Sequence, residues 1–174
     1  MKYLLNFFVV TFFLIVSTYS FAEQKIVVLD MKYVLNNSKA GKGAQNFLKK
    51  SYESNAKKFA DMEKALKKEE SDLLGKKNIL SKEDYAIKSN KLRKKVIAYQ
   101  SERRTSLDKI ATQRAKSREA LMNKIRPIVD SYINENNISI VMDKKYMIGG
   151  LTEYDITKVI IEKLNKELPS LNIQ

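Results

Sequence analysis

The chain has 174 residues, of which 33 are lysine or arginine and 20 are aspartate or glutamate, and it contains no cysteine and no histidine. This composition excludes disulfides, thiol chemistry, the usual zinc sites and any catalytic triad that needs imidazole. The five glycines and two prolines are few for this length, which favours long uninterrupted elements.

Residues 1–22 have the pattern of a secretory signal peptide. Lys2 precedes an apolar run from Phe7 to Val16, and the small residues Ser20 and Ala22 fit the preference of signal peptidase. We predict cleavage after Ala22, which leaves an exported mature chain. The alternative is an uncleaved membrane anchor, because the stretch after Lys2 is uncharged and about long enough to span a bilayer.

The mature chain begins with a strand. Residues 25–30 read KIVVLD, a β-branched run bounded by charge, which predicts a buried strand. Residues 31–37 either extend this strand or form a short helical turn, and Ser38 can cap a following helix. A similar phrase returns near the other end, since VVLDMKYVL (27–35) and IVMDKKYMI (140–148) share four aligned residues. The likeness indicates either an internal duplication or a shared strand composition.

Residues 39–126 have the spacing of two long helices. A seam of mostly apolar residues at intervals of four and three runs from Leu48 to Leu73, and Gly75 stands where a C′ glycine would end the first helix. Ser81 then opens the second helix in a sequence that resembles a capping box.

The second helix has a less regular seam. Its apolar positions continue to Tyr132, but Arg103, Arg114 and either Ser117 or Arg118 interrupt them. Two helices that share so thin a stripe bury little apolar surface, so the pair should flex.

Pro127 should kink the second helix, because its ring clashes with the preceding turn and removes a backbone donor. The 45 residues of 82–126 would span about 67 Å at 1.5 Å per residue. A short connection makes the two helices antiparallel neighbours, and they form a long helical-hairpin arm.

Strand character returns after Asn136-Asn137. Residues 138–142 predict a strand, and 146–148 predict another one after a turn at Lys144-Lys145. Asp155 should cap a last helix that runs from Ile156 to about Leu168.

An antiparallel hairpin returns to its starting point, so the segments on either side of it should meet in one small sheet. We therefore predict an α+β fold, in which residues 23–38 and 127–174 form a β-containing oligomerisation body and residues 39–126 form the protruding arm. The last helix should cover one face of the sheet. The residues predicted for the core of the body are Val27, Val28, Leu29, Ile138, Ile140, Met142, Ile156 and Val159.

The positive charge is confined to the predicted arm. Residues 39–126 carry 25 lysines and arginines against 11 aspartates and glutamates, whereas the rest of the mature chain carries 7 against 9. A field of one sign on one segment attracts anionic partners quickly and weakly.

Nothing in the sequence indicates catalysis, a cofactor or a metal site. Ala40-Gly41-Lys42-Gly43 lacks the spacing of a phosphate-binding loop, and at the start of a helix it is interpreted as a flexible hinge. The body is small for independent stability, and its strands would have open edges, so we expect it to oligomerise.

The order of segments resembles the Skp/OmpH family of periplasmic chaperones across the whole mature chain. The most specific parts are the strand that ends at Asp30, the strand that ends at Asp143, and the helix start at Asp155-Ile156-Thr157. The resemblance implies a homotrimer in which strands of three subunits form a barrel-like body and three arms enclose a cavity.

The same resemblance implies a function without ATP or cofactor. Such a holdase keeps unfolded outer-membrane proteins from aggregating before their insertion into the membrane. Lipopolysaccharide or an anionic membrane surface is a further implied partner, without particular positions. The candidates for client contact are aromatic and basic residues of the arm, although the aromatic ones can instead pack within the hairpin: Phe47, Tyr52, Phe59, Lys67, Lys68, Lys76, Lys77, Tyr85, Tyr99, Arg103 and Arg104.

Two other functions fit parts of the sequence. The pI near 9.7 suggests a basic nucleic-acid-binding protein, although no recognised reading module is present and specific nucleic-acid binding is not expected. An exported coiled-coil structural or envelope protein is the other alternative, and it gains weight if the N-terminal segment stays attached.

Overall fold

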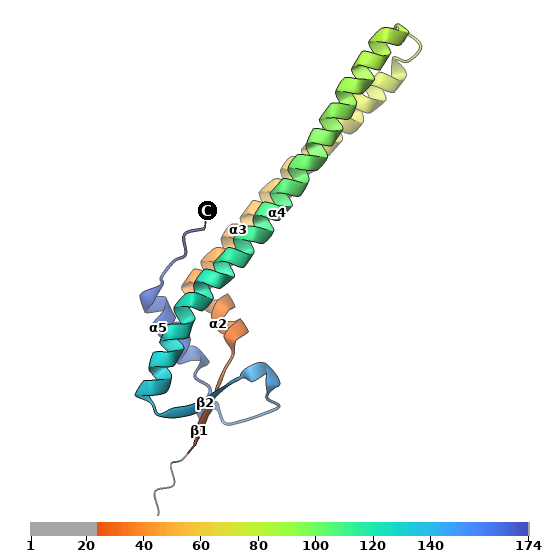
Figure 1. Cartoon of the computed structure of the whole chain (residues 1–174). Helices are drawn as coiled ribbons and strands as arrows, with labels where there is room; N and C mark the ends of the chain where they lie inside the picture. The colour runs from red at the N-terminus through yellow and green to blue at the C-terminus, as the bar shows by residue number, and fades with distance from the viewer. Residues whose placement is uncertain (1–23, 174) are drawn as a thin grey trace, which may run out of the picture.

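The computed structural model describes residues 24–173 and shows a small body from which two long helices project (Figure 1). This arrangement confirms the predicted α+β fold with a helical-hairpin arm. The predicted signal peptide and its cleavage site lie outside the described residues. Among the helices of residues 24–173, none combines the length and the hydropathy of a membrane span.

The body contains a two-stranded parallel sheet of β1 (Lys25–Leu29) and β2 (Ile138–Asp143). Val27 pairs with Val141, and Val28 pairs with Met142. The two similar phrases from opposite ends of the chain therefore lie side by side, as predicted. In the sheet they are offset by one residue from their sequence alignment.

Each strand ends in an aspartate whose side chain starts the next turn of chain. The backbone N–H of Tyr33 donates to Asp30 Oδ1 (2.7 Å), and that of Lys145 donates to Asp143 Oδ1 (3.1 Å). The first aspartate caps the helix α2 (Met31–Asn37), which decides between the two predicted alternatives for this segment. The second caps the short 3-10 helix η1 (Lys144–Tyr146).

The predicted strand at residues 146–148 is wrong. Tyr146 ends η1, and Met147 and Ile148 belong to an irregular connection that leads to a second 3-10 helix, η2 (Thr152–Tyr154). The cap at Asp143 bends the backbone before the apolar residues can extend a ladder. Apolar composition alone does not make a strand when no edge is in register to receive it.

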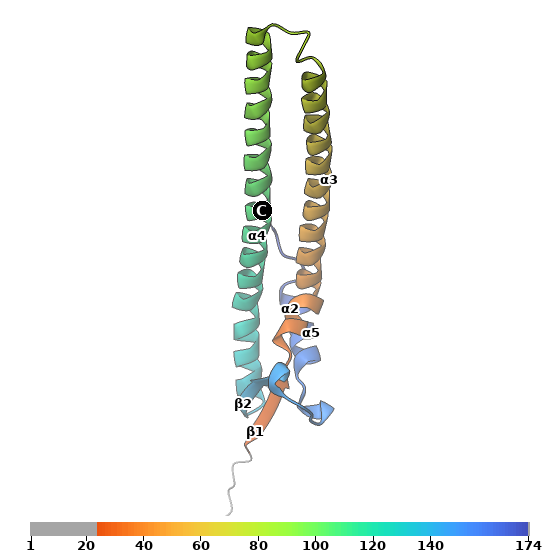
Figure 2. The ribbon, with the colours of Figure 1, turned by 90° about the vertical axis from the view of Figure 1, so that its right-hand side faces the viewer.

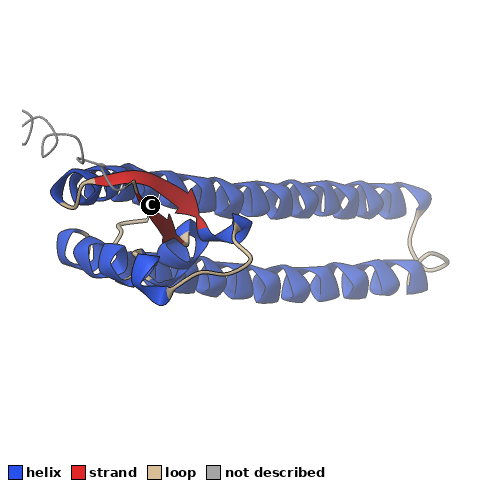
Figure 3. Cartoon of the chain, turned by 90° about the horizontal axis from the view of Figure 1, so that it is seen from below, coloured by secondary structure: helices blue, strands red, loops and turns tan. Residues whose placement is uncertain are grey.

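The arm consists of α3 (Lys39–Gly75) and α4 (Lys82–Glu135), which run antiparallel and side by side (Figures 2 and 3). Both predicted caps are confirmed. Gly41 N–H donates to Ser38 Oγ (3.1 Å) at the start of α3, and Asp84 N–H donates to Ser81 Oγ (3.1 Å) at the start of α4.

Two expectations about the helix ends are corrected. Gly75 is the last residue of α3 and not a left-handed C′ residue, since no glycine among residues 24–173 has a positive φ. Pro127 lies inside α4, which continues without interruption to Glu135. The residues on either side of the proline, Ile125 and Ile128, are buried, so packing holds the helix together across the missing hydrogen bond.

Gly41 is a close-packing residue rather than a hinge. It lies in the first turns of α3 and is buried, and a Cβ built there would stand 1.9 Å from the carbonyl oxygen of Leu35 in α2. Only glycine permits this approach of the two helices. The predicted hinge therefore turns out to be a tight joint at the base of the arm.

One apolar core joins the body to the base of the arm. The helix α5 (Thr157–Glu167) packs against α2 and α4, and it contributes the fully buried Ile160 and Leu164. Ile125 of α4 is equally buried in this cluster, together with Leu121. The lower turns of α4 are thus part of the same core as the sheet.

Five of the eight residues predicted for the core of the body are buried within the chain. These are Val27, Val28, Leu29, Ile138 and Ile156. The other three remain exposed: Ile140 by 47%, Met142 by 40% and Val159 by 37%.

Asp155 connects η1 to the start of α5. Its carboxylate accepts hydrogen bonds from Lys144 Nζ (2.6 Å) and from Thr157 N–H (3.0 Å). Burial pushes the pKa of Asp155 up, but these hydrogen bonds outweigh burial and leave the pKa below its ordinary value. Asp155 therefore stabilises the fold in its ionised form.

Replacing this carboxylate should destabilise the body in a pH-dependent way. We expect Asp155→Ala to lower the free energy of unfolding by about 1–2 kcal/mol at neutral pH, because a helix cap and an ion pair are lost. The lowered pKa means that this contribution is present above the unfolded-state value of about 3.9 and is lost as the pH falls through the folded-state value. Thermal melts at neutral and strongly acidic pH should thus converge for the two proteins. An equal gap at both pH values would contradict this role.

Candidate functional site

Ion pairs between the two helices hold the middle of the arm together. Lys95 of α4 contacts Glu69 of α3 at 2.7 Å, and Lys58 of α3 pairs with Glu102 of α4. All four side chains are roughly half exposed, so these pairs set the register of the helices more than they stabilise them.

Phe59 and Tyr99 form the aromatic centre of the arm. Their ring centroids are 6.0 Å apart in an edge-to-face arrangement, and the side chains are only 6% and 9% exposed. Both were candidates for client contact. Their burial corrects that assignment, because a side chain that fills the seam between α3 and α4 is not available to a client while the hairpin is closed.

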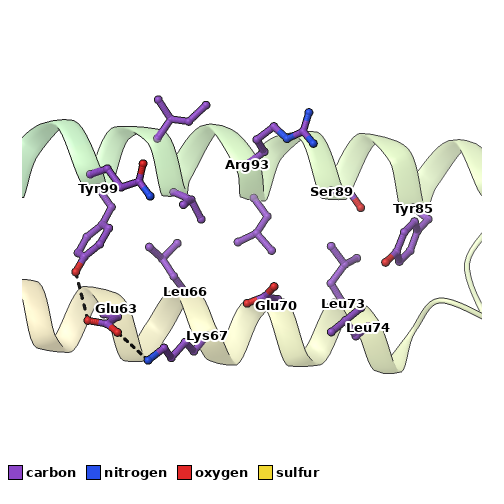
Figure 4. A pocket seen from close by; sticks show the side chains of 14 residues that line it. Glu63, Leu66, Lys67, Glu70, Leu73, Leu74, Tyr85, Ser89, Arg93 and Tyr99 are labelled. Carbon is purple, nitrogen blue, oxygen red and sulfur yellow. Dashed lines mark hydrogen bonds and ion pairs between the residues drawn. The ribbon is translucent and has the colours of Figure 1, made fainter.

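A first cleft, the tip slot, lies between α3 and α4 toward the end of the arm (Figure 4). It has a volume of about 490 Å³. Its apolar lining includes Leu66 and Leu73 from α3 and Leu92 and Val96 from α4, and Tyr85 lies near the loop. The seam separates here enough to leave apolar surface within reach of a ligand.

The charges that line the tip slot balance. Glu63 and Glu70 stand against Lys67 and Arg93. Glu63 accepts hydrogen bonds from Lys67 (2.7 Å) and from the Tyr99 hydroxyl (3.4 Å), and the hydrogen bond from Lys67 is the main cause that lowers the pKa of Glu63. The tip slot is therefore apolar inside and electrically neutral at its rim.

A second cleft, the base groove, lies where the arm meets the body, and its volume is about 600 Å³. Leu35 of α2, Leu48 of α3 and Leu121 of α4 contribute apolar lining. The charged residues that line it are all cationic: Lys49, Arg114 and Arg118.

The remaining candidates for client contact lie on the surface of the arm. Phe47 is 40% exposed and Tyr52 is 56% exposed, and Tyr52 also lines the base groove. Tyr85 is partly buried. The basic candidates are exposed, and of them only Lys67 was placed above in a cleft: Lys67, Lys68, Lys76, Lys77, Arg103 and Arg104.

Sequence reasoning missed the base groove, although a signal for it was present. Arg114 and Arg118 were noticed only as interruptions of the apolar seam. In the structure Gln113 and Ser117 occupy the buried line, at 7% and 5% exposure, and the arginines lie beside it at the groove. A pair of arginines one turn apart next to an apolar seam was the available indication.

Within residues 24–173, no group of three or more histidine, cysteine, aspartate or glutamate side chains is arranged to hold a metal ion. What the arm offers chemically is reversible binding through long-range positive charge, exposed aromatic rings and two apolar clefts.

A small α+β body that carries one long, basic helical hairpin defines a distinct class of fold. The chain belongs to the OmpH-like outer membrane protein family, whose model matches residues 25–164. A solved structure from Caulobacter crescentus CB15, described as a candidate outer membrane chaperone (OmpH-like), shares 16% sequence identity with a TM-score of 0.79. The match covers 91% of this chain and 94% of that one. No curated protein matches the chain.

Proposed function

We propose that the chain is an ATP-independent periplasmic holdase that binds unfolded outer-membrane proteins and prevents their aggregation before insertion. Family membership and the description of the Caulobacter protein support a chaperone role. The observation that carries the proposal is the arm itself, where a surplus of 14 positive charges on residues 39–126 accompanies two open apolar clefts. Many weak contacts of this kind suit a chain without fixed structure.

We propose further that three copies assemble through the body, so that their arms surround a common cavity. Residues paired in a parallel sheet point to the same face, so Ile26, Ile140 and Met142 share one face, and they are 42%, 47% and 40% exposed. Within the described residues β2 has no strand on its outer edge. A two-stranded sheet with an apolar outer face and an open edge is stabilised by association with further copies.

Export to the periplasm with cleavage after Ala22 is part of the same proposal. Basic arms would also be drawn to lipopolysaccharide or another anionic membrane surface close to the place of client insertion. Mass spectrometry of the exported protein is expected to show a chain that begins at Glu23. A chain that retains residues 1–22 would instead support an envelope-anchored structural protein.

The function is tested with a purified chain that starts at Glu23 and a urea-denatured β-barrel protein. On dilution without nucleotide, stoichiometric trimer should suppress light scattering by the client. Client affinity should fall as ionic strength rises from about 0.1 M to about 1 M, because the Debye length shrinks from about 10 Å to about 3 Å. An absence of suppression would overturn the holdase proposal, and nucleic-acid binding that survives physiological salt would favour the basic nucleic-acid-binding alternative.

A further inference from the structure

The two clefts of the arm differ in charge. The tip slot is lined by two carboxylates and two cations, and the base groove is lined by three cations and by no carboxylate of the described residues. Both have an apolar interior of similar volume. A ligand that chooses between them will therefore do so by its charge.

The arginines of the base groove have no acidic partner within the described part of the chain. The salt bridges among residues 24–173 include neither Arg114 nor Arg118. Lys49, the third cation, contacts only Glu53, at 3.9 Å. Arg114 and Arg118 stand one turn apart on α4, and a guanidinium group pairs with a carboxylate through two parallel hydrogen bonds.

The apolar part of the base groove lies beside these cations. Leu48 and Leu121, at 6% and 4% exposure, contribute to its floor, and the ring of Tyr52 is 56% exposed at its wall. A volume of about 600 Å³ falls within the range of small-ligand sites and accommodates a large side chain.

We propose that the base groove binds client segments in which a large apolar side chain is flanked by carboxylates. The apolar side chain packs on Leu48, Leu121 and Tyr52, and the carboxylates pair with Arg114 and Arg118. This inference rests on the proposed holdase function and deepens it by assigning a docking site and a sequence preference. The tip slot, with its balanced rim, binds apolar segments without regard to their charge.

The test uses two short fluorescein-labelled peptides that differ only in charge. One carries a phenylalanine flanked by aspartates, and the other has asparagine in place of each aspartate. Binding to the full chain from residue 23 is measured by fluorescence anisotropy. The Arg114→Gln/Arg118→Gln variant is compared with Arg103→Gln/Arg104→Gln, which removes the same charge from exposed positions elsewhere on α4.

We expect the groove variant to bind the aspartate peptide about tenfold or more weakly, because charge-assisted hydrogen bonds are lost. The matched variant should weaken binding by no more than about threefold, through the long-range field alone. Neither variant should change binding of the asparagine peptide. Equal weakening by the two variants would overturn the proposal, since net charge alone would then explain the binding.

A second measurement locates the peptide without removing charge. The chain has no cysteine, so a polarity-sensitive dye can be placed at Tyr52→Cys, with Ile87→Cys as the distant control. The aspartate peptide should shift the emission of the first dye and not of the second. A shift at Ile87 alone would place the peptide elsewhere and overturn the inference.

Two outcomes separate this inference from neighbouring ones. If the wild-type chain suppresses aggregation but the groove variant loses no preference for the aspartate peptide, the holdase function stands and the groove assignment fails. If the groove variant loses only its binding to vesicles that contain anionic lipid, the occupant is a lipid and the client proposal is overturned.

Discussion

Ile125→Ala is expected to lower the free energy of unfolding by about 2–5 kcal/mol, the range for deletion of a fully buried aliphatic side chain. Ile125 has 0% exposure and packs in the core shared by α2, α4, α5 and the sheet. Since Pro127 already removes one hydrogen bond from this part of α4, the helix relies on Ile125 and Ile128 to stay continuous. The loss should be measured by urea denaturation followed by circular dichroism.

The matched control is Ile97→Ala, which makes the same chemical change on the same helix. Ile97 is 58% exposed, so its truncation should change stability by about 0.5 kcal/mol or less. Similar losses in the two variants would show that the joint between arm and body is not the stabilising centre of the fold.

Ile140→Asp combined with Met142→Asp should prevent the proposed assembly. Both side chains lie on the outer face of β2 and are exposed in the single chain, so the chain itself should fold as before. In a trimer they would be buried, and an unpaired buried carboxylate is costly. Association should weaken by about a thousandfold or more, and light scattering should report one copy in place of three.

The control for this variant carries the same charge on the arm. Ile79→Asp with Ile87→Asp replaces residues that are 81% and 66% exposed near the tip and should leave the trimer intact. If suppression of client aggregation depends on a cavity between arms, it should fall in the first variant and persist in the second. A body variant that remains trimeric would remove the outer face of the sheet from the interface.

The two clefts suggest how one arm can hold a chain without a deep pocket. A neutral slot near the tip and a cationic groove at the base lie along the same pair of helices. An extended client with alternating apolar and acidic segments can contact both. Each contact is weak, so the client can be released without ATP.

Local patterns in the sequence predicted much of this fold correctly. The three-four spacing predicted the two long helices, and Ser38 and Ser81 identified their first turns, because a cap and a helix period depend on residues within a turn of each other. The excess of lysine and arginine in 39–126 identified the basic arm in the same direct way. The antiparallel hairpin also implied that β1 and β2 would meet.

Tertiary structure alone decided the features that depend on distant contacts. It placed Gln113 and Ser117 in the seam and left Arg114 and Arg118 at the groove, because the facing surface of α3 selects which side of α4 is buried. It also made Gly41 a contact point with Leu35 and turned residues 144–148 away from the sheet. Periodicity and caps are properties of neighbouring residues, whereas packing between segments more than a hundred residues apart depends on the whole folded chain.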